Sequence, residues 1–248
     1  MKVNEYATMF QVEQAHWWYK NLRDEVIGWV EKTVAARARS EKIKLLDLGC
    51  GTGGMLQRLQ ERFENISACG MDYYASALSF AKAKTFYPLL QGDVKSMPFR
   101  PGAFDIILCL DVLYTKEAYP GFQNALKTVY ELLVKNGAFI LQLPAFKCLR
   151  SQHDLNVHGV HRFTADEIRE SLCRAGFSEI KVYYRYNLLF GIAWFARKFV
   201  IKNKQESHLV VPGALSNFLL YKYFALESRL NKKLFIPFGV SVFAVAFK

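Results

Sequence analysis

Short apolar segments alternate with amphipathic segments over most of the chain. Apolar runs bounded by glycine, proline or polar residues predict strands at 44–48, 66–71, 89–93, 104–110, 137–143, 179–186 and 240–247. Segments with apolar residues at helical spacing predict helices at 55–63, 75–83, 122–134 and 164–175. Strands that alternate with helices form parallel βαβ units, and near-continuous apolar strands fit a sheet covered on both faces. The pattern therefore predicts an α/β protein with a doubly wound, mostly parallel sheet.

Two further segments flank this alternating pattern. Residues 1–42 carry apolar side chains near helical spacing, which predicts an N-terminal helical lid. Residues 188–237 are expected to form a mainly helical insert before the last strand. The expected organisation is a lid at 1–42, an α/β domain at 43–187 and 238–248, and an insert at 188–237.

A glycine-rich turn follows the first predicted strand. The segment LLDLGCGTGG places Gly49, Gly51 and Gly53 between that strand and the next helix. Glycines let the backbone bend sharply and let a ligand approach, and the helix N-terminus behind them offers free N–H groups. The segment also satisfies the GxGxxG pattern of dinucleotide-binding proteins, so the turn alone does not identify its ligand.

Three aspartates narrow the choice of ligand. Asp47 precedes the turn, where a carboxylate can hold an ammonium group but offers nothing to a pyrophosphate. Asp72 ends the second strand and is placed to accept hydrogen bonds from both hydroxyls of a ribose. Asp93 is placed to accept from an adenine amine, with Val94 near the ring. A ligand with an amino acid part, a ribose and an adenine but no phosphate resembles S-adenosylmethionine.

Four segments resemble successive motifs of the class I (Rossmann-like) S-adenosylmethionine-dependent methyltransferases, in a type 11-like subgroup. They are LLDLGCGTGG, GMDYYASALSFAK, GDVKSMPFRPGAFDIILCLDVLY and LLVKNGAFILQLP, within about residues 43–186. The resemblance implies a Rossmann-like sheet of seven strands. In that family the last strand, here 240–247, runs antiparallel between the fifth and the sixth.

The same resemblance implies which residues contact the cofactor. The N-terminal segment EQAHWWYKNLRDEV is similar to a helix that folds over the cofactor in many such enzymes. The expected contacts are Tyr19 and Arg23 at the methionine carboxylate, Asp47, Gly49, Gly51 and Gly53 at the methionine part, Asp72 at the ribose with Tyr73 beside it, Asp93 and Val94 at the adenine, and Asp111 and Leu113 at the sulfonium side.

A polar loop after the fifth strand supplies candidate catalytic residues. It reads SQHDLNVHGVHRFT and contains His153, His158 and His161. Methyl transfer to a hydroxyl or a protonated amine needs a base, and open α/β sheets bind ligands at the strand ends where this loop lies. The histidines are therefore candidate bases, with structural roles as caps or hydrogen-bond anchors as the alternative. Their spacing is not a familiar ligand set, so no metal is expected.

The insert is basic and aromatic. The chain carries a formal net charge of +11, and the stretches WFARKFVIKNK and FLLYKYFALESRLNKKLF interleave aromatic and basic residues. A basic amphipathic helix can lie on an anionic membrane or cover an apolar substrate, and it can equally be a cap packed on the domain. The segment LDVL after the fourth strand lacks the proline-containing motifs of nucleobase methyltransferases, so no nucleic acid partner is expected.

The composition and motifs together favour one function and leave two alternatives. Five scattered cysteines without a CxxC pair, and no apolar run at the N-terminus, predict a cytoplasmic protein, with peripheral contact to the inner face of the membrane through 188–237 as an option. The favoured function is methyl transfer to oxygen or nitrogen of a small-molecule, glycan-linked or lipid-linked acceptor. The histidine loop is similar to that of a subgroup associated with cell-surface glycan and lipid-linked pathways. The alternatives are a nicotinamide-dependent oxidoreductase, and a non-catalytic cofactor-binding module that docks on membranes.

Overall fold

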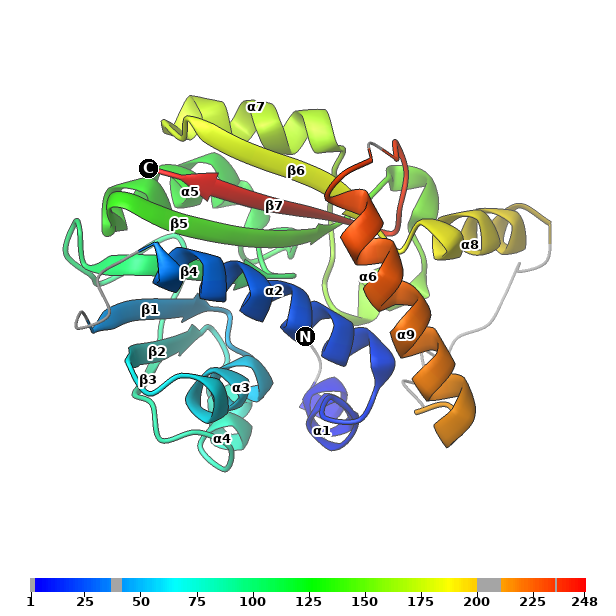
Figure 1. Ribbon diagram of the computed structural model, residues 1–248, viewed down its shortest axis with the longest axis horizontal. Coiled ribbons are helices and arrows are strands. Elements are labelled where there is room, and N and C mark those ends of the chain that lie inside the picture. The colour runs from blue at the N-terminus through cyan, green and yellow to red at the C-terminus, as the bar shows by residue number, and fades with distance from the viewer. Residues whose placement is uncertain (1–2, 37–41, 200–210, 235) are drawn as a thin grey trace.

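A single sheet runs through the molecule (Figure 1). The computed structural model describes residues 3–36, 42–199, 211–234 and 236–248, without the side chains of residues 3–4, 153 and 196–199. The strand order is β3-β2-β1-β4-β5-β7-β6. Strand β7 pairs antiparallel with both β5 and β6, and the other neighbouring pairs are parallel, which confirms the predicted fold class. The strands are β1 Ile43–Leu48, β2 Ile66–Asp72, β3 Leu89–Gln91, β4 Phe104–Leu110, β5 Leu133–Pro144, β6 Glu179–Arg185 and β7 Ser241–Phe247.

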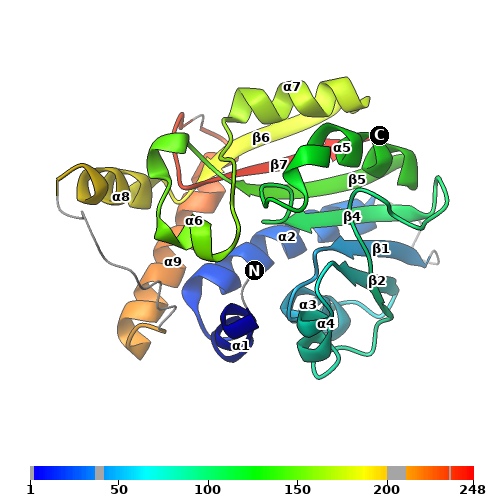
Figure 2. The same cartoon turned by 180° about the vertical axis from the view of Figure 1, so that it is seen from behind.

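Helices cover both faces of the sheet, as the apolar strands require. Strand side chains alternate between the faces, so Leu45 and Ile106 pack on one side while Leu46 and Ile107 pack on the other. The first face is covered by α2, α3 and α4, and the second by α5 and α7 (Figures 1 and 2). These helices span Trp17–Ala35 (α2), Gly54–Arg62 (α3), Ala75–Ala81 (α4), Phe122–Leu132 (α5) and Ala165–Ala175 (α7).

Several predicted boundaries differ from the structure by one or two residues, and the start of the fifth strand differs by four. The helix expected at 122–134 ends at Leu132, and β5 begins at Leu133 rather than at residue 137. Leu133 pairs with Phe104 of β4 before a shift in register, so this apolar residue belongs to the sheet although it also fits the helical spacing. The strand expected at 89–93 ends at Gln91, and Asp93 lies in the turn that follows.

The flanking segments are helical and pack on each other. Residues 1–42 contain α1 (Val3–Val12) and α2, and the second half of α2 is buried against the sheet. The insert contains α8 (Asn187–Phe199) and α9 (Ala214–Asn231), which lie at the same end of the molecule in both views (Figures 1 and 2). Phe224 of α9 stacks on Trp17 of α2 at a ring-centroid distance of 4.8 Å. The division into lid, domain and insert at 42/43, 187/188 and 237/238 remains a proposal.

Three short helical segments lie near the strand ends in the described part of the chain. None of the helices in the described ranges has the length and apolar character needed to cross a membrane. The short segments are Tyr119–Gly121, Lys147–Leu149 and α6, Gln152–Asn156.

Candidate active site

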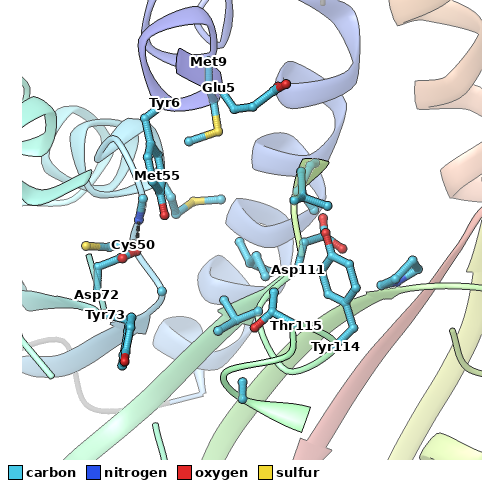
Figure 3. A pocket seen from close by; sticks show the side chains of 18 of the residues that line it. Glu5, Tyr6, Met9, Cys50, Met55, Asp72, Tyr73, Asp111, Tyr114 and Thr115 are labelled. Atoms are coloured by element: carbon cyan, nitrogen blue, oxygen red, sulfur yellow. Dashed lines mark hydrogen bonds between the residues drawn. The ribbon is translucent and has the colours of Figure 1, made fainter. Parts of the chain in front are cut away.

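A cavity of about 570 Å³ lies at the carboxyl ends of β1, β2, β4 and β5. Figure 3 shows Asp72 and Tyr73 on one wall and Asp111 and Tyr114 on the opposite wall. Helices α1 and α2 cover the opening above these strand ends, and side chains such as Tyr6 of α1 line the cavity. We call the wall formed by the ends of β1, β2 and β3 the cofactor side, and the wall formed by the ends of β4 and β5 the acceptor side.

The glycine turn has a backbone that side chains would disturb. Gly49, Gly51 and Gly53 have φ angles of 75°, 54° and 81°, in the left-handed region that favours glycine. A Cβ at Gly49 would collide with Val112, and a Cβ at Gly51 would lie 3.1 Å from Cε of Met9 in α1. Gly49 and Gly51 line the cavity, whereas Gly53 packs against α4 and does not. The turn therefore leaves room for a ligand at its first two glycines.

Asp72 ties the glycine turn to the end of β2. The N–H of Gly51 donates to Oδ2 of Asp72 at 2.9 Å, and the N–H of Tyr74 donates to Oδ1 at 2.9 Å. Burial raises the pKa of Asp72, although these backbone hydrogen bonds lower it. Each carboxylate oxygen keeps a lone pair that can accept from a ribose hydroxyl. Tyr73 lies beside it on the cavity wall.

Asp47 is a buried carboxyl that lacks a cation. Its residue is 2% exposed, it lines the cavity, and no lysine, arginine or histidine of the described residues forms an ion pair with it. Burial raises the pKa of Asp47 to about 7, and the negative charges of Asp72 and Glu13 add to this effect. A buried carboxylate needs a positive partner to stay ionised. The ammonium group of an amino acid part would supply that partner, so the residues present fit S-adenosylmethionine.

Most of the remaining predicted cofactor residues also line the cavity, with Asp111 on the opposite wall and Leu113, like Gly53, outside the lining. Asp93 and Val94 line the cavity, although Lys95 also pairs with Asp93 at 3.3 Å. Tyr19 and Arg23 of α2 line it as well. Leu113 is buried in the apolar core next to the cavity and does not line it.

Helix α1 contributes a residue that the sequence analysis did not anticipate. Glu13, just after α1, accepts a hydrogen bond from the Thr52 hydroxyl of the glycine turn at 2.6 Å and forms an ion pair with Lys84. Arg23 donates to the backbone carbonyl of Glu13 at 2.7 Å. Tyr6, Met9 and Glu13 follow one another at helical spacing, which is the signal that would have placed them on one face. These contacts hold α1 over the cofactor side.

The acceptor side is centred on Asp111, which follows β4. Its φ of 55° is uncommon for a residue other than glycine. The backbone N–H of Asp111 donates to the carbonyl of Gln142 at 2.9 Å, and the Gln142 amide donates back to Oδ2 of Asp111 at 2.8 Å. Strand β5 thus fixes both the backbone and the carboxylate of Asp111, aiming it into the cavity.

A buried arginine continues this network. Arg185 at the end of β6 is 1% exposed and donates to Oε1 of Gln142 at 2.7 Å. Burial raises the pKa of Asp111 to about 6, while the Gln142 hydrogen bond and the charges of Arg185 and Arg162 hold it lower than burial alone would. Asp111 is therefore an acid whose ionisation lies near neutral pH, on the wall opposite Asp72.

The histidine loop is held together by an arginine–aspartate pair. Arg162 donates to both carboxylate oxygens of Asp154 at 2.8 and 3.1 Å and to the carbonyl of Ala145 at 2.9 Å. Burial raises the pKa of Asp154, but the hydrogen bonds and charge of Arg162, together with hydrogen bonds from Ser151, lower it overall. Both residues line the cavity, and their bidentate pair gives Asp154 and Arg162 a structural role in the loop.

The three candidate histidines lie in different surroundings. His158 approaches Glu117 at 3.1 Å and the Tyr74 hydroxyl at 3.3 Å, and both partners line the cavity although His158 does not. His161 approaches Glu167 at 2.8 Å and stacks on Tyr119, away from the cavity lining. The backbone of His153 lies in α6, and its side chain is outside the described part of the structure.

Three cavity residues after β4 were also missed. Tyr114, Thr115 and Glu117 follow Asp111 in the segment DVLYTKE and line the acceptor side. Glu117 accepts from the Tyr74 hydroxyl at 2.8 Å, which links the acceptor side to the cofactor side. Their position directly after a buried strand was the available signal.

Comparison with known proteins agrees with this geometry. Residues 46–141 match the family described as a methyltransferase domain. This match agrees with the resemblance to the class I S-adenosylmethionine-dependent methyltransferases. It also supports S-adenosylmethionine, the cofactor predicted from Asp47, Asp72 and Asp93.

Two curated relatives show how far the similarity extends. The chain is 27% identical over 159 residues to a malonyl-[acyl-carrier protein] O-methyltransferase of Geobacter sulfurreducens, covering 58% of each protein. It is 31% identical over 134 residues to a trans-aconitate 2-methyltransferase of Deinococcus radiodurans, covering 52% of this chain and 46% of that protein. The similarity thus spans about half the length of these relatives and centres on the methyltransferase domain.

The fold similarity extends over the full chain. A structure from Thermotoga maritima, described as a possible histamine N-methyltransferase, superposes with a TM-score of 0.59 at 17% identity. The alignment covers 99% of this chain and 96% of that one. The methyltransferase domain and its flanking helices therefore form an arrangement already seen in a solved structure.

Proposed function

We propose that this protein transfers the methyl group of S-adenosylmethionine to an oxygen or nitrogen atom of a small-molecule, glycan-linked or lipid-linked acceptor. The cofactor supplies an activated methyl group when bound. The observation that carries the proposal is the pairing of two walls in one cavity. The cofactor side presents Asp47, Asp72 and Asp93, and the acceptor side presents a fixed carboxylate, Asp111.

On the cofactor side, each polar residue would hold a different part of the ligand. Asp47 would hold the ammonium group, Asp72 the ribose hydroxyls and Asp93 the adenine amine, with Val94 against the ring. Tyr19 and Arg23 would face the methionine carboxylate. The Arg23 side chain already donates to carbonyls at the end of α1, so α1 and the methionine part would be ordered together.

On the acceptor side, the protein must orient the acceptor, exclude water and remove a proton where the acceptor carries one. Asp111 lines the cavity directly and ionises near neutral pH, so we assign it the proton acceptor role. This assignment differs from the base expected in the histidine loop. His158 is the alternative base, acting through Glu117 and Tyr74, whereas the contacts of His161 support a structural role.

The names of the relatives do not identify the acceptor of this protein. Their names refer to a malonyl-[acyl-carrier protein] and to trans-aconitate, which are chemically unlike. The class of acceptor must therefore be inferred from the residues on the acceptor side of this chain. Each nitrogen of Arg162 already donates to Asp154 or Ala145, so we do not assign it as the main anchor for an anionic acceptor.

The proposal is tested by binding and by label transfer. Calorimetry should show binding of S-adenosylmethionine and of S-adenosylhomocysteine, while NADH should give no fluorescence change. The purified protein is then incubated with methyl-labelled S-adenosylmethionine and with separate small-molecule, glycan and lipid extracts. Label should enter one extract. Cofactor binding without label transfer into any extract would favour the non-catalytic module, and NADH binding would favour the oxidoreductase.

A further inference from the structure

Helix α9 has an unusual distribution of side chains. Its inner face is fixed to the protein largely by polar contacts around one buried ring, Phe224. Asn217 accepts from the N–H of Trp17 at 2.9 Å, the Tyr221 hydroxyl donates to Asp24 at 2.6 Å, and Asn231 donates to the carbonyl of Tyr184 at 2.8 Å. The inner face is thus held both by these hydrogen bonds and by the aromatic cluster around Phe224, which includes Trp17 and Tyr186.

The outer face of α9 carries the aliphatic side chains. Leu215 is 72% exposed, and Leu219, Leu226 and Leu230 are exposed as well. Their spacings of 4, 7 and 4 residues return to the same side of the helix, so they form one line that we call the leucine stripe. Surface helices ordinarily bury this kind of stripe and expose polar residues. We therefore expect a binding partner to cover the leucine stripe.

The flank of the leucine stripe indicates the charge of whatever covers it. Lys222 and Arg229 are exposed seven residues apart beside the stripe. Across the sequences of α8 and α9 the sole acidic residue is Glu227, which is buried and accepts from the N–H of Asn187. Among the described residues, α8 and α9 thus offer exposed leucines and cations but no exposed carboxylate of their own, and the exposed Asp24 of α2 is bound by the Tyr221 hydroxyl.

Helix α8 repeats this combination at the same end of the molecule (Figures 1 and 2). Leu188, Ile192 and Phe195 are exposed at spacings of four and three residues, which places them on one side of the helix. Arg197 and Lys198 follow them in the sequence. Both helices therefore offer exposed apolar side chains, and both have basic residues nearby in their sequences.

We infer that α8 and α9 form a docking surface for an anionic lipid bilayer. Leucines and aromatic residues would enter the boundary between headgroups and acyl chains, while Lys222 and Arg229 would pair with lipid phosphates. A second copy of the chain fits less well, because a two-fold interface would bring the same cations face to face. Nucleic acid would neutralise the cations but leave the leucines uncovered.

Two aromatic rings connect the buried face of α9 to the cavity lining. The Tyr186 ring packs between Phe224 of α9, at 5.3 Å, and Trp18, at 3.9 Å, and Trp18 lines the cavity. A bilayer bound to the leucine stripe would therefore lie on the other side of α9 from these rings, which connect that helix to the cavity lining. Vesicle binding does not require methyl transfer, so the two proposals can fail separately.

The test is co-sedimentation of the full chain with vesicles of phosphatidylcholine, with and without about 30% phosphatidylglycerol. We expect binding to the anionic vesicles that weakens as salt increases. Leu219→Ser combined with Leu226→Ser should lower binding by about tenfold or more, since each buried leucine contributes to partition. The matched control is Leu90→Ser, which removes an exposed leucine from β3 at the opposite edge of the sheet and should bind like wild type.

The charges are tested in the same assay. Lys222→Gln with Arg229→Gln should lower binding to anionic vesicles by about fivefold per charge, and Lys127→Gln with Lys135→Gln should leave it unchanged. Thermal melts and S-adenosylmethionine binding check that each variant is folded. Wild-type protein that stays in the supernatant, or leucine variants that sediment like the Leu90→Ser control, would overturn the inference. A wild-type dimer in sedimentation velocity that the leucine variants abolish would assign the surface to a second copy instead.

Discussion

The cofactor side and the acceptor side of the cavity are assembled from different kinds of contact. On the cofactor side, Asp47 and Asp72 each end a strand or precede a turn, and their neighbours in sequence complete their surroundings. On the acceptor side, Asp111 is held by Gln142 of β5 and, through it, by Arg185 of β6. Short sequence motifs therefore mark the first wall, although contacts such as Gly51 to Asp72 join distant segments there too, whereas nothing local in the sequence marks the pairing that fixes the second. The same difference should appear when each wall is altered.

Replacing Asp72 should produce the largest effect. Asp72→Ala would remove the acceptor of two ribose hydrogen bonds and of the N–H groups of Gly51 and Tyr74. Hydrogen bonds to a charged group contribute about 2 kcal/mol each, so the Kd for S-adenosylmethionine should rise about a thousandfold. Calorimetry measures this, with Asp72→Asn as the control that keeps the side-chain shape. Unchanged affinity in Asp72→Ala would refute the ribose assignment.

Replacing Asp111 should lower methyl transfer while leaving cofactor binding nearly unchanged. Asp111→Asn keeps the size of the side chain but cannot accept a proton, so methyl transfer should fall about a hundredfold. The Kd for S-adenosylhomocysteine should change by no more than a few-fold, because the cofactor side is untouched. Label transfer into the active extract measures the rate across pH. Wild-type turnover in Asp111→Asn, together with a loss in His158→Ala, would move the base to the histidine loop.

The pH dependence of Asp47 should give opposite slopes for stability and binding. The pKa of buried Asp47 is raised to about 7, so the cofactor-free folded protein holds a proton that the unfolded chain has already released. Stability should therefore fall as pH rises from the ordinary carboxyl range through about 7, by up to about 1.4 kcal/mol per pH unit.

Binding should respond in the other direction, because an ammonium group favours the ionised carboxylate of Asp47. Affinity for S-adenosylmethionine should rise about tenfold between pH 6 and pH 8. Thermal melts and calorimetry at several pH values give both slopes, and Asp47→Asn should remove its share of each. Parallel slopes would contradict the proposed partner of Asp47.

The smallest effect is expected within the histidine loop. His158→Ala should lower turnover only about threefold, by loosening Glu117 and Tyr74, if Asp111 is the base. His161→Ala should leave turnover unchanged and slightly lower the melting temperature, since it removes contacts with Tyr119 and Glu167. A larger kinetic effect from His161→Ala would show that this side chain reaches the acceptor in a state different from the structure.

The fold and the cofactor wall could be predicted because their signals are short-range. Strand runs, the glycine turn and the carboxylates at strand ends each occupy a few consecutive residues. The end of the helix at Leu132 could not be placed, because Leu133 suits both a helix and a strand until its pairing with Phe104 is known. Glu13 was missed for a related reason, since its partners Thr52 and Lys84 are distant in sequence.

The acceptor side was harder to predict, because the sequence does not show which polar side chains already have hydrogen-bond partners within the protein. Arg162 and Asp154 occur in a loop that looks rich in catalytic groups, but they bind each other. Gln142 lies inside an apolar strand and gives no sign that it positions Asp111. Only the three-dimensional pairing distinguishes these roles.

The position of β7 has a consequence for how the chain folds. This strand completes hydrogen bonding on both of its sides, yet it follows β6 in the sequence only after α8 and α9. During synthesis, β6 must therefore remain without its sheet partner until the ribosome has released everything between Arg185 and Ser241. Such late, non-local pairing slows folding and exposes strand edges in the meantime. Truncation just before Ser241 would be expected to yield a chain prone to aggregation even though the glycine turn and its acids were complete.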